Sequence, residues 1–250
     1  MRKLYILFLL SLVFVLAKGN DLQVLNGANA AYKKGQFEVA LKGYQQLLDS
    51  GYSSPDIYYN LGNANYRLDN IAAAILNYEK AHKLAPGDED VEMNLRLANT
   101  RLTDKIEGVP EFFLKRWWIS FITIFSIQVW SVLIVLFFLS GFALLIVYLF
   151  SRELILKRTS FYAGLVLVIL ALASMGIASA QDNYFRQHKD AIVFNGVVNV
   201  KSAPNDKQKT LYIIHEGTKV TVLEDNDNWL KVELPNGSVG WITAAAVKSI

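Results

Sequence analysis

The sequence predicts a multidomain membrane protein with three parts: an all-α repeat solenoid, a transmembrane helical hairpin and a small all-β barrel. Three observations predict these parts. Matching residues recur at an offset of 34 before position 104, two long blocks near the middle hold no charged residue, and short runs of β-branched and aromatic residues follow Gln181. A repeat period, a membrane-length apolar block and strand-sized runs indicate these three kinds of structure in turn.

The chain begins with the pattern of a secretory signal peptide. Arg2 and Lys3 precede an apolar run over 4–16, and small residues end that run. A basic start, an apolar core of this length and small residues at its end are typical of an export signal. We expect residues 1–19 to be removed by cleavage after Gly19. If they are retained, they form a third span and leave the rest of the topology unchanged.

A helical repeat of 34 residues follows. The matching positions are Asn26/Asn60/Asn94, Asn29/Asn63, Ala30/Ala64/Ala98, Tyr32/Tyr66, Lys33/Arg67/Arg101, Ala40/Ala74 and Tyr44/Tyr78. This pattern resembles the tetratricopeptide repeat, a helix-turn-helix unit that buries its apolar side by stacking on its neighbours. We expect a domain over 20–106, with repeats at 21–54 and 55–88 and a capping helix at 89–103.

The recurring polar residues of each first helix predict a binding groove. The Asn at 26, 60 or 94 and the basic residue at 33, 67 or 101 are seven residues apart, about two helical turns, so they share a face. The resemblance implies that this face lines a concave groove, where amides bond a peptide backbone and cations bond its carboxylates. The alternative is a solvated face that recurs because the repeat was duplicated. The candidate partner-binding residues are Asn26, Asn29, Lys33, Asn60, Asn63, Arg67, Asn94 and Arg101.

The two uncharged blocks predict the hairpin. They cover 117–151 and 159–181, and roughly 20 apolar residues in a helix cross a hydrocarbon core. We expect transmembrane helices at 127–150 and 160–181, with a linker and interfacial segment at 107–126. The alternative is a buried hairpin of a soluble domain, but core helices of soluble proteins rarely lack charge over such a length.

The link between the spans, residues 151–159, sets the expected orientation. It holds Arg152, Lys157 and Arg158 against Glu153, and basic loops tend to remain in the cytoplasm. Both flanking modules would then lie in the periplasm, anchored to a bacterial inner membrane by a two-pass hairpin. Further candidates for the membrane interface precede the first span: Lys115, Arg116, Trp117 and Trp118.

Six short runs predict a barrel over 185–250. They lie at 191–194, 196–201, 210–215, 219–223, 229–234 and 239–242. Turn residues separate them, and Asn236-Gly237 is typical of a tight hairpin, because both residues tolerate positive φ. Five or six strands in a segment of this length imply a closed or nearly closed barrel.

The order of these elements resembles the bacterial SH3-like domain. The residues that carry the resemblance include Val198–Pro204, Asn228–Val232 and Pro235–Ile242. It implies binding of cell-wall peptides or of protein segments. We expect Trp229 and Trp241 to pack in the core and at the rim, with stacking on a ligand as the alternative.

Composition argues against several kinds of site. The chain has no cysteine, which excludes thiolate metal sites and a cysteine nucleophile. Neither outer module has a basic surplus, with 9 basic and 12 acidic residues over 20–110 and 8 of each over 182–250, so we expect no nucleic-acid partner. The three histidines lack ligand spacing, and no phosphate loop or nucleophile motif occurs. We expect no catalytic residue, no metal and no cofactor.

The order of the segments resembles the BatE-like proteins of bacterial aerotolerance operons over essentially the whole mature chain. Residues 103–106 lead into the aromatic and basic approach at 110–118, before the two spans and the barrel. The resemblance implies partners among membrane-anchored von Willebrand A-type proteins and a MoxR-type ATPase complex, and a role in oxidative-stress tolerance or envelope integrity. The expected function is a non-enzymatic scaffold. The alternative is a peptidoglycan-binding envelope factor that recruits a cell-wall enzyme.

The expected topology is tested with an amine-reactive reagent that cannot pass lipid. In sealed cells it should modify Lys33 and Lys231 and leave Lys157 unmodified, because only the link between the spans faces the cytoplasm. Mass spectrometry of the labelled peptides gives the result. Modification of Lys157 with protection of the other two lysines would mean that the topology is inverted.

Overall fold

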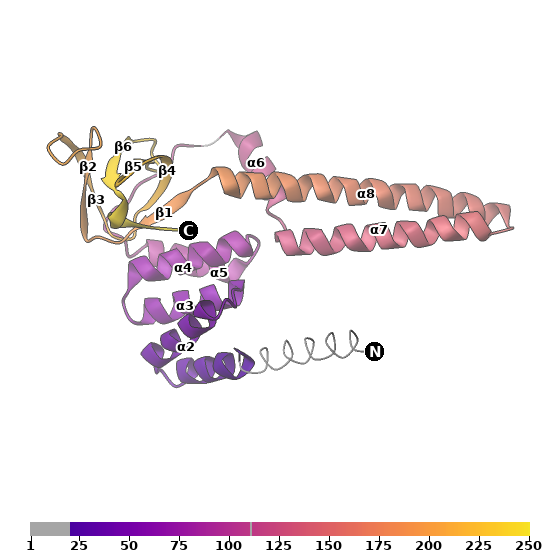
Figure 1. Ribbon diagram of the computed structural model, residues 1–250, viewed down its shortest axis with the longest axis horizontal. Coiled ribbons are helices and arrows are strands. Elements are labelled where there is room, and N and C mark those ends of the chain that lie inside the picture. Colours follow the sequence, from indigo (N-terminus) through magenta and orange to yellow (C-terminus); the bar gives the residue numbers. More distant parts are fainter. Residues whose placement is uncertain (1–20, 111) are drawn as a thin grey trace, which may run out of the picture. The chain divides into compact units, whose positions relative to one another are not determined.

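The computed structural model describes residues 21–110 and 112–250, so the signal peptide expected at 1–19 lies outside the described part. The chain divides into two compact units, whose elements are labelled in Figure 1. One unit contains the helices before residue 84, residues 88–108 and the whole β-sheet from Asp190 onward. The other contains residues 84–87 and 109–189. The sheet, although last in the chain, belongs to the same unit as the repeats.

The first unit starts with paired helices. A helix over 21–33 packs with α2 (Phe37–Asp49), α3 (Pro55–Arg67) packs with α4 (Ile71–Leu84), and α5 (Glu89–Asn99) packs on α3. Ser54 caps α3 by accepting a hydrogen bond from the Ile57 N–H, and Pro55 occupies the first turn, where its missing N–H costs nothing. These helices confirm the predicted all-α repeat region.

The turn inside each repeat has the same backbone geometry. Gly35 and Asp69, 34 residues apart, both follow a first helix with positive φ, 74° and 64°. Glycine adopts this left-handed conformation without a steric penalty, and aspartate is among the residues that tolerate it. The two repeats therefore share one turn geometry, although a glycine occupies the position in the first repeat and an aspartate in the second.

Close approach of the two helices of a repeat requires one glycine. In the second repeat, an added Cβ on Gly62 would lie 2.5 Å from atoms of the buried Tyr78 ring. In the first repeat, Ala28 occupies the position of Gly62, and Gly43 of α2 supplies the space instead, since a Cβ there would lie 2.8 Å from the Ala28 Cβ. Both repeats therefore keep one glycine where their two helices meet, but it lies on the second helix in the first repeat and on the first helix in the second repeat.

The sheet has seven antiparallel strands. In chain order they are β1 (Asp190–Val193), β2 (Val197–Lys201), β3 (Thr210–His215), β4 (Lys219–Asn226), β5 (Trp229–Glu233), β6 (Val239–Thr243) and, after the 3-10 helix η1 (Ala244–Ala246), β7 (Val247–Ser249). The spatial order is β3-β2-β6-β5-β4-β1-β7, with β3 and β7 at the edges. Alternate residues of β5 and β6 are buried in one apolar core, as a sheet with one covered face requires. The SH3-like all-β class is confirmed, and β7 is an additional strand.

The second unit contains α6 (Phe113–Ile122), α7 (Ile127–Phe150) and α8 (Leu154–Gln187). The helices α7 and α8 lie side by side (Figure 1) and are long and apolar enough to cross a membrane. Only 6% and 11% of their most apolar windows are buried, whereas the core helix of a soluble protein is mostly buried. Their apolar surface therefore needs an apolar surrounding.

The helix α8 is longer than the segment predicted at 160–181. It begins at Leu154, within the expected link at 151–159, and continues to Gln187. The basic residues of the link do not end the helix, because Lys and Arg are good helix formers. The non-helical connection is thus only Ser151 to Glu153.

Small residues let α7 and α8 approach each other. Ser160, Gly164, Ala171 and Ser174 are the small buried residues of α8, and Gly141 is buried on α7, a composition typical of close helix contacts in membranes. At the far end, Gln181 is buried, and its Nε2 donates a hydrogen bond to the Phe125 carbonyl at 3.0 Å. Gln181 was not singled out from the sequence, because a single amide at the end of an apolar block has no pattern.

The close approach at Gly62 gives a stability prediction. Gly62→Ala should lower the free energy of unfolding by about 1–3 kcal/mol through overpacking against Tyr78, measured by thermal unfolding of the full chain at 222 nm. Gly27→Ala is the matched control, because a Cβ there meets nothing within 4 Å and alanine favours the helix by up to about 1 kcal/mol. Equal melting temperatures for the two variants would contradict this account of the packing.

Candidate partner-binding surfaces

Each repeat has the same hydrogen bond between its two helices. Tyr44 Oη donates to Asn29 Oδ1 and Tyr78 Oη donates to Asn63 Oδ1, both at 2.7 Å. Burial raises the pKa of Tyr44 to about 12, with Tyr32 adding to the shift, and burial also raises the pKa of Tyr78. Both phenols are therefore protonated donors at neutral pH, so each asparagine accepts through Oδ1 and keeps its Nδ2 donor.

The helix α5, which corresponds to the first helix of a third repeat, joins the same hydrogen-bond network. Asn94 Nδ2 donates to Tyr59 Oη at 2.9 Å and to Asn63 Oδ1 at 3.0 Å. Its own Oδ1 keeps its capacity to accept. Two of the predicted groove residues, Asn63 and Asn94, are thus brought into direct contact, with a spare donor on one and a spare acceptor on the other. An extended peptide backbone offers the complementary carbonyl and N–H groups.

Other predicted residues of this face have no internal partner. Asn26 and Lys33 are exposed and Asn60 is half-buried, and none of the three side chains hydrogen-bonds or ion-pairs with another residue in the part of the chain that the structure describes. Asn26 and Asn60, together with Asn29, Asn63 and Asn94, form what we call the amide row. The sequence pattern could not separate its internally bonded members from the others.

The basic residues at the ends of the first helices differ in their surroundings. The Arg67 guanidinium lies 4.4 Å from the centre of the Phe37 ring, a cation–π contact that leaves its N–H groups available. Arg101 forms an exposed ion pair with Asp69 at 2.8 Å, and such a pair is weak enough to be exchanged for a ligand carboxylate. Lys33, Arg67 and Arg101 thus offer cations beside the amide row.

A second feature joins the repeats to the sheet. Ile192 of β1 is fully buried in one apolar cluster with residues of α4 and α5, and Phe194, Ile250 and Leu102 pack against that cluster. Gly217 has φ of 86°, and an added Cβ would meet Leu102. We call this contact region the seam. The two outer modules predicted from the sequence are therefore packed into one body.

Charged groups at the seam are paired. Lys219 Nζ lies 2.8 Å from Glu79 Oε2 and 3.2 Å from Asp190 Oδ2, with the Glu79 side chain 9% exposed. Burial alone would lower the pKa of Lys219, but the carboxylates of Glu79 and Asp190 outweigh this effect and raise it. The lysine therefore remains charged and bridges α4 to the sheet.

Asp104 makes the other polar contact of the seam. It accepts hydrogen bonds from the His215 N–H at 2.6 Å, from His215 Nδ1 at 2.7 Å and from Thr218 Oγ1 at 2.9 Å. Burial alone would raise the pKa of this carboxyl, but these bonds hold it below its ordinary value. The carboxylate thus ties the segment after α5 to the turn between β3 and β4.

A cleft of about 600 Å³ lies beside the seam, and Arg96, Lys105 and Glu107 are among its lining residues. Its more buried charges, Glu79, Lys219 and Asp104, are already paired across the seam. Residues 21–110 and 112–250 contain no group of three or more His, Asp or Glu that could hold a metal ion.

The remaining predicted residues are distributed over several elements. Arg116, Trp117 and Trp118 are exposed on α6, which also carries Lys115. Arg152 and Arg158 are exposed at the connection of the hairpin, and Lys157 is half-buried there. Trp229 on β5 and Trp241 on β6 are half-buried, so each keeps one part of its ring outside the sheet core.

Comparison with protein families supports both modules. Residues 25–89 match the model of the tetratricopeptide repeat, and residues 196–248 match that of the bacterial SH3 domain. Both are typically non-catalytic interaction modules. No curated protein matches the chain. The matches show the two modules and leave the helical hairpin between them outside any matched family.

Removal of the Asp104 charge should weaken the seam. Asp104→Asn is expected to lower the free energy of unfolding at pH 7 by about 1.5–3 kcal/mol, the range for a hydrogen bond to a charged group. Because the folded-state pKa lies below the ordinary 3.8, this contribution is present above pH 3.8 and is lost as the pH falls through the lowered value. The difference in the free energy of unfolding between Asp104→Asn and the wild type should therefore disappear in acid.

The measurement is the melting temperature of the full chain between pH 2.5 and 7, followed by tryptophan fluorescence. Asp206→Asn is the matched control, because Asp206 is exposed and its side chain makes no hydrogen bond to another described residue. The Asp104 carboxylate does not stabilise the seam if Asp104→Asn lowers the melting temperature only as much as the control does. The same conclusion follows if the decrease in melting temperature does not vary with pH.

Proposed function

We propose that this protein is a non-enzymatic membrane scaffold whose repeat groove binds an extended segment of a partner protein. The observation that carries the proposal is the amide row. Its asparagines hold the repeats together through one atom and keep an unused donor or acceptor, while Asn26 and Asn60 are unengaged. The row thus presents backbone-binding amides beside three cations, which favours a segment that also carries carboxylates.

The hairpin supports the membrane part of the proposal. Two helices of spanning length return the chain to the side from which it entered, and the seam requires the repeats and the sheet to be on one side. We place that side in the periplasm of a bacterial inner membrane, because Arg152, Lys157 and Arg158 lie at the connection between the spans.

The proposed partners come from the resemblance to BatE-like proteins. They are membrane-anchored von Willebrand A-type proteins, acting with a MoxR-type ATPase complex in aerotolerance or envelope stress. The match to the tetratricopeptide repeat supports protein binding in general. The match to the bacterial SH3 domain favours a second candidate, a peptidoglycan-binding factor that recruits a cell-wall enzyme.

The groove is tested by Asn60→Ala with Arg67→Ala. This pair should weaken binding to a membrane-anchored von Willebrand A-type protein from the same organism by at least about tenfold, for the loss of one neutral and one charge-assisted hydrogen bond. Asn63 is retained, because its replacement would also break the bonds from Tyr78 and Asn94. Binding is measured by microscale thermophoresis with the full chain in detergent.

The matched control is Lys42→Ala with Gln46→Ala, which removes one cation and one amide from exposed positions on α2. Equal binding by both double variants would overturn the groove assignment. Purified cell-wall sacculi are the contrasting probe. Sedimentation of the full chain with sacculi, unaffected by the groove variants, would favour the peptidoglycan-binding candidate.

A further inference from the structure

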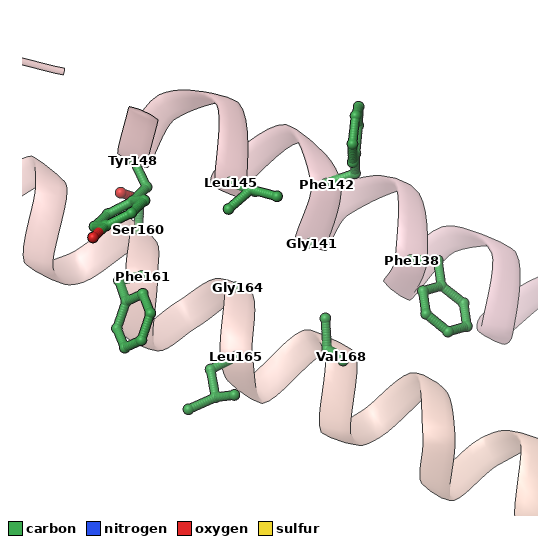
Figure 2. A pocket seen from close by; sticks show the side chains of 10 residues that line it. All are labelled: Phe138, Gly141, Phe142, Leu145, Tyr148, Ser160, Phe161, Gly164, Leu165 and Val168. Carbon is green, nitrogen blue, oxygen red and sulfur yellow. The ribbon is translucent and has the colours of Figure 1, made fainter. Parts of the chain in front are cut away.

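Two hollows adjoin on the α7–α8 hairpin. The first has a volume of about 290 Å³ and an almost entirely apolar lining that includes Leu145, Leu165 and Val168. Figure 2 shows Gly141 and Gly164 facing each other, with Tyr148 and Phe161 at one end of the hollow and Phe138 at the other. The helices touch at this pair, since an added Cβ on Gly141 would lie 3.6 Å from the Gly164 carbonyl oxygen, and the hollow lies beside it.

The second hollow, of about 270 Å³, lies where α7 ends and α8 begins. It is lined by Tyr148, Leu154, Lys157, Arg158, Phe161 and Tyr162. Two of these residues, Tyr148 and Phe161, also line the first hollow. The hollows therefore meet at this aromatic pair, whose ring centres are 5.4 Å apart.

The first hollow is apolar, like the acyl chains of a phospholipid, and the second is lined by basic residues that suit its anionic headgroup. The basic residues Lys157 and Arg158 line the second hollow together with Tyr148 and Tyr162, and no acidic residue lines it. Within the part of the chain that the structure describes, neither cation forms an ion pair. Lys157 Nζ lies 5.2 Å from the centre of the Tyr148 ring, which positions the ammonium at the edge of the apolar hollow.

The dimensions also fit a membrane leaflet. From Tyr148 to Phe138 the helix α7 rises about 15 Å at 1.5 Å per residue, which is half of a hydrocarbon core about 30 Å thick. The basic residues lie at the end of the helices, where the headgroups would be. A surface inside a bilayer is surrounded by lipid, so the ligand with an anionic head and an apolar tail is already present at high concentration.

We propose that the hairpin binds one anionic phospholipid. Its phosphate is held by Lys157 and Arg158, with the Tyr162 hydroxyl as a further donor, and one acyl chain lies along the apolar hollow between Tyr148 and Phe138. The proposal rests on membrane insertion of the hairpin. It adds a specific ligand site to residues that would otherwise serve only to orient the spans.

The test uses native mass spectrometry of the full chain in mild detergent, titrated with dioleoylphosphatidylglycerol or dioleoylphosphatidylcholine. The wild type should retain one phosphatidylglycerol more strongly than phosphatidylcholine. Arg158→Gln should weaken phosphatidylglycerol binding about fivefold, the factor for about 1 kcal/mol per basic residue at an anionic surface. Arg152→Gln is the matched control, because Arg152 belongs to the same link and lines neither hollow.

A second pair of variants tests the apolar hollow. Leu165→Trp fills it and should weaken retention of phosphatidylglycerol, whereas Val166→Trp adds the same side chain at a similarly exposed position that lines neither hollow. Equal retention of both lipids by the wild type, or equal effects within either variant pair, would overturn the site.

Flotation of the wild type with phosphatidylcholine liposomes is measured separately. A chain that does not float would overturn membrane anchoring and the lipid site together. A chain that floats but does not discriminate between the two lipids would overturn the lipid site alone.

Discussion

The seam between α4 and the sheet is the interaction on which the arrangement of the chain depends. Ile192 is fully buried against the helices, and the Lys219 ammonium bridges carboxylates from both modules. A partly buried ion pair of this kind contributes little net stability against an apolar replacement, but it disfavours any packing that leaves the buried Glu79 carboxylate unpaired. The seam therefore specifies which surfaces of the repeats and the sheet meet.

This constraint also limits what can separate the two modules in sequence. The stretch between them must leave the seam and return to it, so a structure with an even number of crossings is required if it enters a bilayer. The helices α7 and α8 meet this requirement with a connection of only Ser151 to Glu153. The topology of the hairpin and the packing of the outer modules are consequences of the same requirement.

Much of the fold followed from periodic features of the sequence. The offset of 34 residues predicted the repeats, the uncharged blocks predicted the long helices, and strand-sized runs predicted most of the sheet. The seam could not be predicted, because Asp104 and His215 are 111 residues apart and belong to no shared period. The strand β7 has three residues, too few for a recognisable alternation.

The candidate groove stays a prediction, but the structure explains why part of its residue pattern recurs. The recurrence of Asn29 and Asn63 has a structural cause, since both accept a tyrosine hydrogen bond. That bond is compatible with ligand binding, because an amide has both a donor and an acceptor and the tyrosine uses only the acceptor. The structural role thus occupies the Oδ1 atoms of these asparagines, and the proposed binding role would use their Nδ2 atoms.

The order of synthesis gives the seam a further consequence. The helix α4 leaves the ribosome long before β1, so the face of α4 that Ile192 covers is open to solvent while the hairpin is being made. Exposed apolar surface of this kind attracts chaperones and other incomplete chains. Synthesis of the last segment thus completes the core of the first, and a chain that ends before β1 would keep that face of α4 uncovered and be recognised as unfinished.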